Sequence, residues 1–297
     1  MVLSIQNEYA PLQRVVIGRG SPYQRDKAQV AAEMNEFPQV PDTDRRQEVL
    51  NLSYPSEVEL VHEYRDFVAV LERYGVKVLL ANPDVAYSFD YTCPRDIGFV
   101  IGSHFFIANM AVQSRANEIE TIRHHLTCIQ SDRIEIPQDC LLEGGDVIVL
   151  DDSTVLAGFN RRSNRRGAEF LQQFCVPLGI DVIPVPHRQL HLDCCLNPLG
   201  ANHLLIHPGS LEPGGEVWPM LEAHDWIEVE NREREYLATN VLSINPNTII
   251  ARSHESCARV NRKLAEAGYN VEQVDFDGVP ATGGSFRCAS LPLERAT

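Results

Sequence analysis

Residues 140–185 read CLLEGGDVIVLDDSTVLAGFNRRSNRRGAEFLQQFCVPLGIDVIPV, and they carry a complete unit of secondary structure. Two short apolar runs flank the turn residues at 151–153, which predicts two strands joined by a tight turn. The segment 160–175 has polar residues at helical spacing, and the apolar run at 180–185 predicts another strand. The stretch therefore predicts a ββαβ unit.

The same order of elements recurs along the chain. A second clear copy runs from TNVLSI (239–244) through TIIARS and a helix at 254–267 to NVEQVDF, with Gly268 as the helix stop. Fainter copies begin at LQRVVIG (12–18), GFVIG (98–102) and HLDCCLNPLG (191–200). Five units predict a closed, pseudo-symmetric α/β array in which each unit buries its apolar face against its neighbours. The alternative is a plain α/β sandwich whose parts resemble one another by accident.

The bulk composition limits the classes of partner. The chain has 297 residues and a formal net charge of -15, so we expect neither nucleic acid nor an anionic membrane as a partner, because both need a basic face. The N-terminal residues lack the pattern of a secretory signal, and no linker divides the sequence. The eight cysteines form no CxxC pair, which favours reduced thiols and no metal site. We therefore expect one cytoplasmic domain over residues 1–297.

Cys288 lies in GGSFRC (283–288), directly after Arg287. Most buried cysteines are inert, but this segment is too polar for a strand core, and a cationic neighbour or substrate favours the thiolate. Three further segments hold the partners that a thiolate needs, namely CPRD (93–96), LEGGD (142–146) and HLD (191–193). All three lie at or beside the start of a predicted unit, so a ring would bring them to a common centre with Cys288.

The HLD segment predicts that His191 and Asp193 share one face of an extended strand, because side chains alternate along strands. Glu143 directly precedes two glycines that permit a tight bend. We expect it to accept a hydrogen bond from His191 and hold the imidazolium form. For Asp146, a role in the site and a hydrogen bond that fixes the turn are both open. Asp96 stands beside an arginine in CPRD, which taken alone is most simply a local ion pair.

Together these residues describe a cysteine nucleophile, a histidine and several acids around a planar cation. A guanidinium fits, since its fork of N–H donors matches paired carboxylates. CPRD, LEGGD, HLD and GGSFRC, in this order, resemble the guanidino-group modifying superfamily: arginine deiminases, dimethylarginine dimethylaminohydrolases and amidinotransferases. The resemblance runs from NEYAPLQRVVIG (7–18) to GGSFRC. It implies the pentein fold, a five-bladed α/β propeller of ββαβ units around a central active site, with no cofactor.

The resemblance also implies roles for individual residues. It makes Asp96 and Asp193 the binders of the guanidinium. It makes Glu143 the residue that orients His191, and Cys288 the nucleophile that attacks the guanidino carbon.

The substrate tail and the acceptor are less defined. Arg162 resembles the arginine that holds the substrate carboxylate in deiminases, with Arg161 as the alternative; exposed charges at a helix start are the other interpretation. PRD, HLD and GGxxRC favour a hydrolase of arginine or an arginine derivative. HLDCCLNPLG, with Asn197 and Gly200, also resembles the HxDxxxNxxG run of amidinotransferases, which transfer the amidino group to an amine.

A third hypothesis is a non-catalytic ribosome-binding protein of the same fold, which the acidic charge disfavours. The expected partner is a small guanidino compound. A homo-oligomer is compatible with the sequence, and so is a lid formed by the charged, proline-containing segment 20–56.

Overall fold

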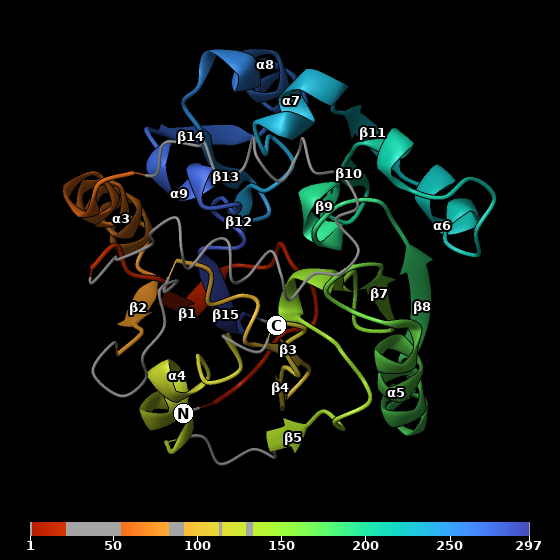
Figure 1. The fold of residues 1–297 in the computed structure, drawn as a ribbon. Coiled ribbons are helices and arrows are strands. Elements are labelled where there is room, and N and C mark those ends of the chain that lie inside the picture. Colours follow the sequence, from red (N-terminus) through yellow and green to blue (C-terminus); the bar gives the residue numbers. More distant parts are fainter. Residues whose placement is uncertain (1, 22–54, 83–91, 113–114, 129–132, 297) are drawn as a thin grey trace, which may run out of the picture.

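The computed structural model describes residues 2–21, 55–82, 92–112, 115–128 and 133–296. Within these ranges the strands form five three-stranded sheets. Figure 1 shows the sheets arranged around one centre, with helices on the outside. The prediction of an α/β fold built from five repeated units around a centre is confirmed, and this architecture is the pentein fold. Of the segment considered as a lid, residues 22–54 lie outside the described part of the chain.

Each sheet, which we call a blade and name by its inner strand, has the same order of strands. The inner strands are almost wholly buried, and they are β15 (Ser290–Arg295), β3 (Gly98–Ile101), β6 (Val147–Val149), β9 (Leu196–Pro198) and β12 (Leu242–Asn245). The middle strands are β1 (Leu12–Ile17), β4 (His104–Ile107), β7 (Thr154–Phe159), β10 (His203–Ile206) and β13 (Thr248–Arg252). The outer strands are β2 (Lys77–Leu80), β5 (Arg133–Glu135), β8 (Asp181–Pro186), β11 (Asp225–Glu228) and β14 (Asn270–Val274). Every middle strand pairs antiparallel with its inner strand and parallel with its outer strand.

Helices connect the middle and outer strands, as the parallel pairing of those strands requires. They include α3 (Glu57–Arg73), α4 (Glu120–Leu126), α5 (Arg165–Cys175), α6 (Trp218–Glu222) and α8 (Ala258–Glu266), while α7 (Asn231–Glu235) and α9 (Gly278–Ala281) are shorter additions between blades. In α3 the residues Leu60, Tyr64, Phe67 and Leu71 recur at helical spacing and form the buried face. Ser56 caps this helix by accepting the N–H of Glu59.

Two helices begin later than the sequence pattern predicts. The segment predicted from residue 160 becomes helical only at Arg165, because the Asn164 side chain accepts the N–H of Gly167 at 2.8 Å and caps the helix there. The helix predicted over 254–267 has a 3-10 turn at Glu255–Cys257 before α8 begins. A side-chain cap thus sets the start of α5, whereas the His254 side chain caps the 3-10 turn that precedes α8.

The inner strand of the first blade comes from the far end of the chain. We expected the first unit to begin with Leu12–Ile17, but this strand is the middle one, and β15 pairs with it antiparallel from Leu12 opposite Arg295 to Ile17 opposite Ser290. Leu291 and Leu293 of β15 are fully buried, and each side chain of this kind stabilises the fold by about 1.5–3 kcal/mol. The ring is therefore closed by the strand that directly follows Cys288.

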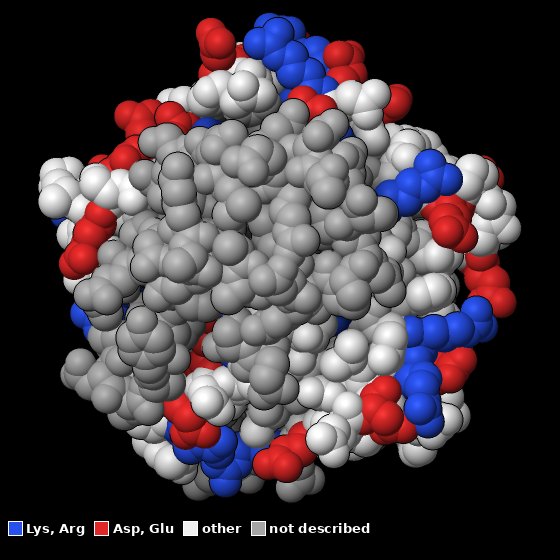
Figure 2. Space-filling view, viewed as in Figure 1, with Lys and Arg blue, Asp and Glu red and all other residues white. Residues whose placement is uncertain are grey.

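The surface carries both signs of charge. In Figure 2 acidic and basic side chains alternate around the rim of the face shown, with no large basic patch among the described residues there. Among the described residues no helix combines the length and apolar character needed to cross a membrane.

Candidate active site

The predicted site residues lie where the inner strands begin. Asp96 comes just before β3, Glu143 just before β6, and Cys288 just before β15. His191 and Asp193 precede β9 in the same way. The inner strands lie around the centre of the ring. The residues before them are up to 192 positions apart in the sequence (288 minus 96), and the ring brings them together.

Glu143 is a buried carboxylate held by three groups. Its Oε2 lies 2.9 Å from His191 Nε2 and 2.9 Å from Arg162 Nε, and its Oε1 accepts the N–H of Ala111 at 2.9 Å. Burial is the largest single influence and would raise the pKa of Glu143, but Arg162 and His191 outweigh it and lower this pKa to about 2. Glu143 is therefore ionised at neutral pH and can stabilise a protonated His191.

His191 is surrounded by acids. Burial works to lower its pKa, yet Asp96, Asp146 and Glu143 together raise the pKa of His191 to about 10. Since Nε2 faces Glu143, Nδ1 is the ring nitrogen on the side of Asp96, 3.6 Å from its Oδ1. A Cβ on Gly145 would lie 2.6 Å from the Cγ of His191, so only glycine leaves room for the ring at this position.

One oxygen of Asp96 accepts a hydrogen bond, and the other faces His191 Nδ1 at 3.6 Å. Arg115 Nη1 donates to Oδ2 at 2.8 Å, and Arg162 Nη2 lies 4.0 Å from the same atom. Oδ1 is buried and has no hydrogen-bond partner among the described residues. Arg115 is itself fixed by Glu118 through two hydrogen bonds of 3.0 and 2.8 Å. Sequence reasoning missed Arg115, which lies in an irregular segment outside the recognised motifs.

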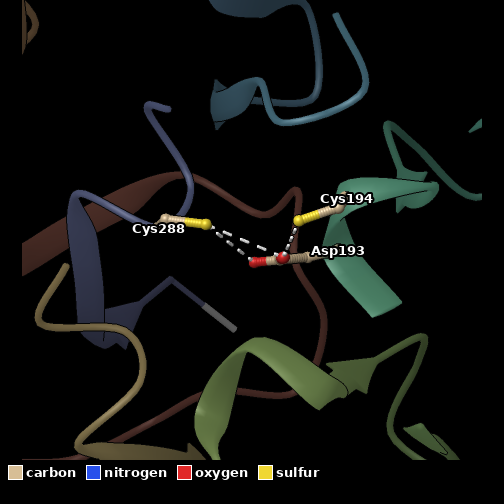
Figure 3. Close-up of side chains that lie close together, drawn as sticks. All are labelled: Asp193, Cys194 and Cys288. Atoms are coloured by element: carbon tan, nitrogen blue, oxygen red, sulfur yellow. Dashed lines mark hydrogen bonds between the residues drawn. The ribbon is translucent and has the colours of Figure 1, made fainter. Parts of the chain in front are cut away.

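Cys288 faces a carboxylate. Its Sγ lies 3.7 Å from both oxygens of Asp193, and Figure 3 shows the two side chains pointing at each other. The thiol of Cys194, and then burial and the charge of Asp193, raise the pKa of Cys288 well above its ordinary value despite an opposing contact with Cys93. Burial likewise raises the pKa of Asp193, against the attraction of Arg287, whose Nε lies 3.4 Å away. Without a bound cation, the neutral thiol is the stable form.

The β12 blade contributes Asn240, which sequence reasoning missed. It lies just before β12, at the position that Asp96, Glu143 and Cys288 occupy in their own blades. Its Nδ2 donates to Cys288 Sγ at 3.2 Å, and its Oδ1 accepts the backbone N–H of Cys288 at 3.1 Å. The signal that could have found it was the repeat itself, because TNVLSI aligns with the other inner strands.

The HLD segment is not a strand, and the prediction that His191 and Asp193 share a strand face is wrong. His191 is extended, but Leu192–Cys194 is a 3-10 turn. The reason is a long-range contact: Asp146 Oδ1 accepts the N–H of Leu192 at 2.8 Å and also bonds His187 Nε2 at 2.9 Å. Asp146 therefore fixes this turn. Its part in substrate binding stays a prediction.

The two candidate arginines lie in different environments. Arg162 is buried, and its guanidinium holds Glu143, whereas Arg161 is exposed at the surface. Arg162 thus belongs to the cluster, through a contact that the sequence did not indicate. That either arginine holds a substrate carboxylate stays a prediction.

Two groups of side chains offer the donor atoms of a metal site. One consists of Asp193, Cys194 and Cys288, and the other of Asp96, Glu143 and His191, with the ligand atoms of each group within 4.8 Å of one another. In the second group Arg162 bonds Glu143 and Arg115 bonds Asp96. Those carboxylates are therefore already paired with cations of the chain itself.

Comparisons with known proteins show which family and which structures the chain is similar to. The family model described as N,N dimethylarginine dimethylhydrolase, eukaryotic, matches residues 32–295. The uncharacterized protein YkgA of Bacillus subtilis is 35% identical over 203 residues, which are 68% of this chain and 68% of that protein. The N(G),N(G)-dimethylarginine dimethylaminohydrolase of Pseudomonas aeruginosa is 24% identical over 243 residues, 81% of this chain and 91% of that enzyme.

Among solved structures, the chain is similar to SxtG, an amidinotransferase of Microseira wollei in saxitoxin biosynthesis. The TM-score is 0.79 at 19% identity, and the match covers 99% of this chain and 98% of that one. The matched family and these named enzymes modify guanidino groups, either as hydrolases or as amidinotransferases. The family match spans most of the sequence and every motif of the cluster, and on that ground the chain belongs to the N,N dimethylarginine dimethylhydrolase family.

Proposed function

We propose that the chain hydrolyses the guanidino group of arginine or an arginine derivative through a covalent amidino-thioether on Cys288. The observation that carries this proposal is Oδ1 of Asp96, which is buried in the same cluster as the thiol and the carboxylate of Asp193. It has no hydrogen-bond partner among the described residues, and His191 Nδ1 lies 3.6 Å from it. A buried carboxylate oxygen without a donor is costly unless a ligand supplies one. A guanidinium supplies several N–H donors together with a positive charge.

Substrate binding would also activate the nucleophile. A guanidinium held between Asp96 and Asp193 brings its charge next to Cys288, whose thiol is otherwise disfavoured from ionising. An adjacent cation favours the thiolate and lowers the thiol pKa. The donation from Asn240 Nδ2 stabilises the same charge. The nucleophile is then formed chiefly when the correct substrate is present.

The reaction divides into two steps around one covalent intermediate. The thiolate attacks the guanidino carbon, the C–N bond to the departing amine breaks, and His191 supplies the proton that this amine takes. His191 suits this role because its pKa of about 10 keeps it protonated at neutral pH. Water then attacks the amidino-thioether and gives its proton to His191. The ureido product leaves, and Cys288 is released as the thiolate.

Amidino transfer is the alternative outcome for the same intermediate, with an amine in place of water. The HLDCCLNPLG run supported it through Asn197. In the structure the Asn197 amide donates to the backbone oxygens of Thr239 and Val241, at 3.1 and 2.7 Å, and so joins the β9 blade to the β12 blade. This structural contact accounts for Asn197 without an acceptor, so the run gives no preference for transfer.

The decisive experiment incubates the protein with arginine, N-methylated arginines and other guanidino compounds, with and without amine acceptors. Ammonia or methylamine together with a ureido product, in the absence of an acceptor, is the expected result. Turnover that depends on an added amine would establish the transferase instead. Cys288→Ser should lower kcat by about 10³-fold or more, whereas Cys257→Ser, which alters a buried thiol in the α8 region, should leave it near the wild-type value.

Trapping of the intermediate tests the nucleophile directly. His191→Ala removes the proton donor of the first step as well as the base of the second. The adduct should form slowly and be hydrolysed more slowly still, so we expect mass spectrometry after long incubation with substrate to detect an amidino adduct on Cys288. An adduct on another cysteine, or full activity of Cys288→Ser, would refute the assignment.

A further inference from the structure

Cys93 and Cys194 both lie beside Cys288, and Cys194 also approaches Asp193. Cys194 Sγ lies 3.6 Å from Asp193 Oδ1, the oxygen that Cys288 Sγ approaches to 3.7 Å. Figure 3 shows the two sulfurs converging on this carboxylate from different segments, and the ligand atoms of the three residues lie within 4.8 Å of one another. The proposed hydrolysis uses Cys288 and Asp193 but gives Cys194 no task.

We propose that Cys194 and Cys288 form a reversible disulfide when a small peroxide enters the site, and that this bond masks the nucleophile. The bond is a new modification site. Its inhibitory consequence rests on the proposed function, because only a catalytic Cys288 makes the bond inhibitory.

The local structure permits the two sulfurs to meet. Bond formation requires a separation of about 2.05 Å, so the sulfurs must move together from their present positions within 4.8 Å. Neither residue is inside a strand: Cys194 ends the 3-10 turn Leu192–Cys194, and Cys288 precedes β15. Rotation of two short side chains and a small adjustment of these turns can close the gap.

The neighbouring Cys195 cannot form this disulfide with Cys288. Its Sγ donates to the backbone oxygen of Leu192 at 3.2 Å, and its side chain is buried in the apolar core of the β9 blade. Adjacent cysteines in a chain thus have opposite orientations here, one toward the site and one toward the core. Cys195 is therefore the natural control for Cys194.

The chemistry balances with hydrogen peroxide as the oxidant. The thiolate of Cys288, which is the minor form in the protein without substrate, attacks one peroxide oxygen, so that an S–O bond forms, the O–O bond breaks and hydroxide leaves. Oxidation should therefore be faster at alkaline pH. The Cys194 thiolate then attacks the sulfur of this sulfenic acid, forms the S–S bond and expels the second hydroxide. The two hydroxides take up the two thiol protons as water. A dithiol reductant restores both thiols. Because Cys194 and Cys288 are 4% and 2% exposed, the oxidant must be small.

The test treats the full chain with hydrogen peroxide in a Cys128→Ser background, since Cys128 is an exposed thiol that would react on its own. After acid quenching and alkylation of free thiols, peptide mass spectrometry should find the Cys194 and Cys288 peptides joined, with two hydrogen atoms lost. Activity should fall as this species accumulates and return on reduction. In Cys194→Ser the joined peptide should be absent, and activity, relative to its own starting value, should be lost irreversibly as Cys288 over-oxidises. Cys195→Ser should behave as the parent does.

Three results would overturn the disulfide. The first is no joined peptide in the parent. The second is an equal yield of the same two joined peptides in Cys194→Ser, where Cys195 would have to form the link, and the third is a link from Cys288 to Cys93 that disappears in Cys93→Ser. A joined Cys194–Cys288 peptide in a fully active protein has a different meaning. The disulfide would then stand, and the assignment of Cys288 as the nucleophile would fail.

Discussion

At the scale of single residues, the proposed mechanism makes the ionisation of Cys288 set the pH dependence of catalysis. Its Cys194 neighbour, burial and Asp193 raise the pKa of this thiol well above its ordinary value in the protein without substrate. The acidic limb of kcat/KM reports the free enzyme and should therefore lie well on the alkaline side of neutrality. The acidic limb of kcat reports the enzyme–substrate complex. In that complex the bound cation favours the thiolate, so this limb should lie at lower pH than the limb of kcat/KM. Above about 10, loss of the proton from His191 should lower both.

Steady-state rates measured across pH check this expectation, and the ultraviolet absorbance difference between wild type and Cys288→Ser reports the thiolate itself. If kcat/KM were already at its plateau at neutral pH, or if the two acidic limbs coincided, activation of the thiol by substrate would be contradicted.

At the scale of elements, the segments before the inner strands form the site, and Asn240 before β12 offers the sharpest variant. Asn240→Asp keeps the oxygen that accepts the N–H groups of Cys288 and Ser285 but replaces the donor to Sγ by a second oxygen. The negative charge should raise the pKa of Cys288 further and move the acidic limb of kcat/KM upward. A lost hydrogen bond to a charged group predicts a fall in kcat of about 10- to 100-fold.

Asn197→Asp is the matched control, because this asparagine also joins the β9 and β12 blades but does not contact Cys288. It should reduce the free energy of unfolding and leave the pH profile where it is. Equal pH profiles for the two variants would mean that Asn240 has a structural role only.

The elements themselves were largely predictable, whereas the contacts between them were not. Apolar periodicity located the strands and helices because each blade buries one face of each element. The turn at Leu192–Cys194 escaped prediction because Asp146, 46 residues earlier, holds its first N–H. Arg115 and Asn240 escaped for a similar reason: their partners, Asp96 and Cys288, lie 19 and 48 residues away in the sequence. Single-sequence patterns contain no information on such distant pairs.

At the scale of the whole molecule, Glu8 connects three blades at the centre of the ring. Its carboxylate bonds Arg287 at 2.6 and 3.1 Å, lies 3.7 Å from Arg95 Nη1, and accepts the N–H of Val149 at 3.4 Å. Burial is the largest influence and would raise its pKa, but Arg287 and Arg95 lower the pKa of Glu8 from 4.5 to about 2. A depressed carboxyl pKa stabilises the fold above pH 4.5, and this contribution disappears as the pH falls toward 2.

Glu8→Gln should therefore lower the free energy of unfolding at neutral pH by about 3–5 kcal/mol, since it leaves buried arginines without their partner. Urea unfolding at several pH values should also show a weaker pH dependence between 4.5 and 2 than in wild type. Glu120→Gln breaks an exposed pair with Arg123 and should cost less than about 1 kcal/mol. A Glu8 variant as stable as this control would show that the central network contributes little.

The closing strand has a consequence for how the protein is made. During synthesis the first blade waits without its inner strand while the other four emerge, and β15 is the last of the described strands to leave the ribosome. Cys288 precedes that strand by a single residue, so the thiol cannot take its place beside Asp193 until the final strand pairs with β1. A nascent chain therefore carries every other member of the cluster before it carries Cys288. On the role proposed for Cys288, catalytic competence and completion of the ring arrive together.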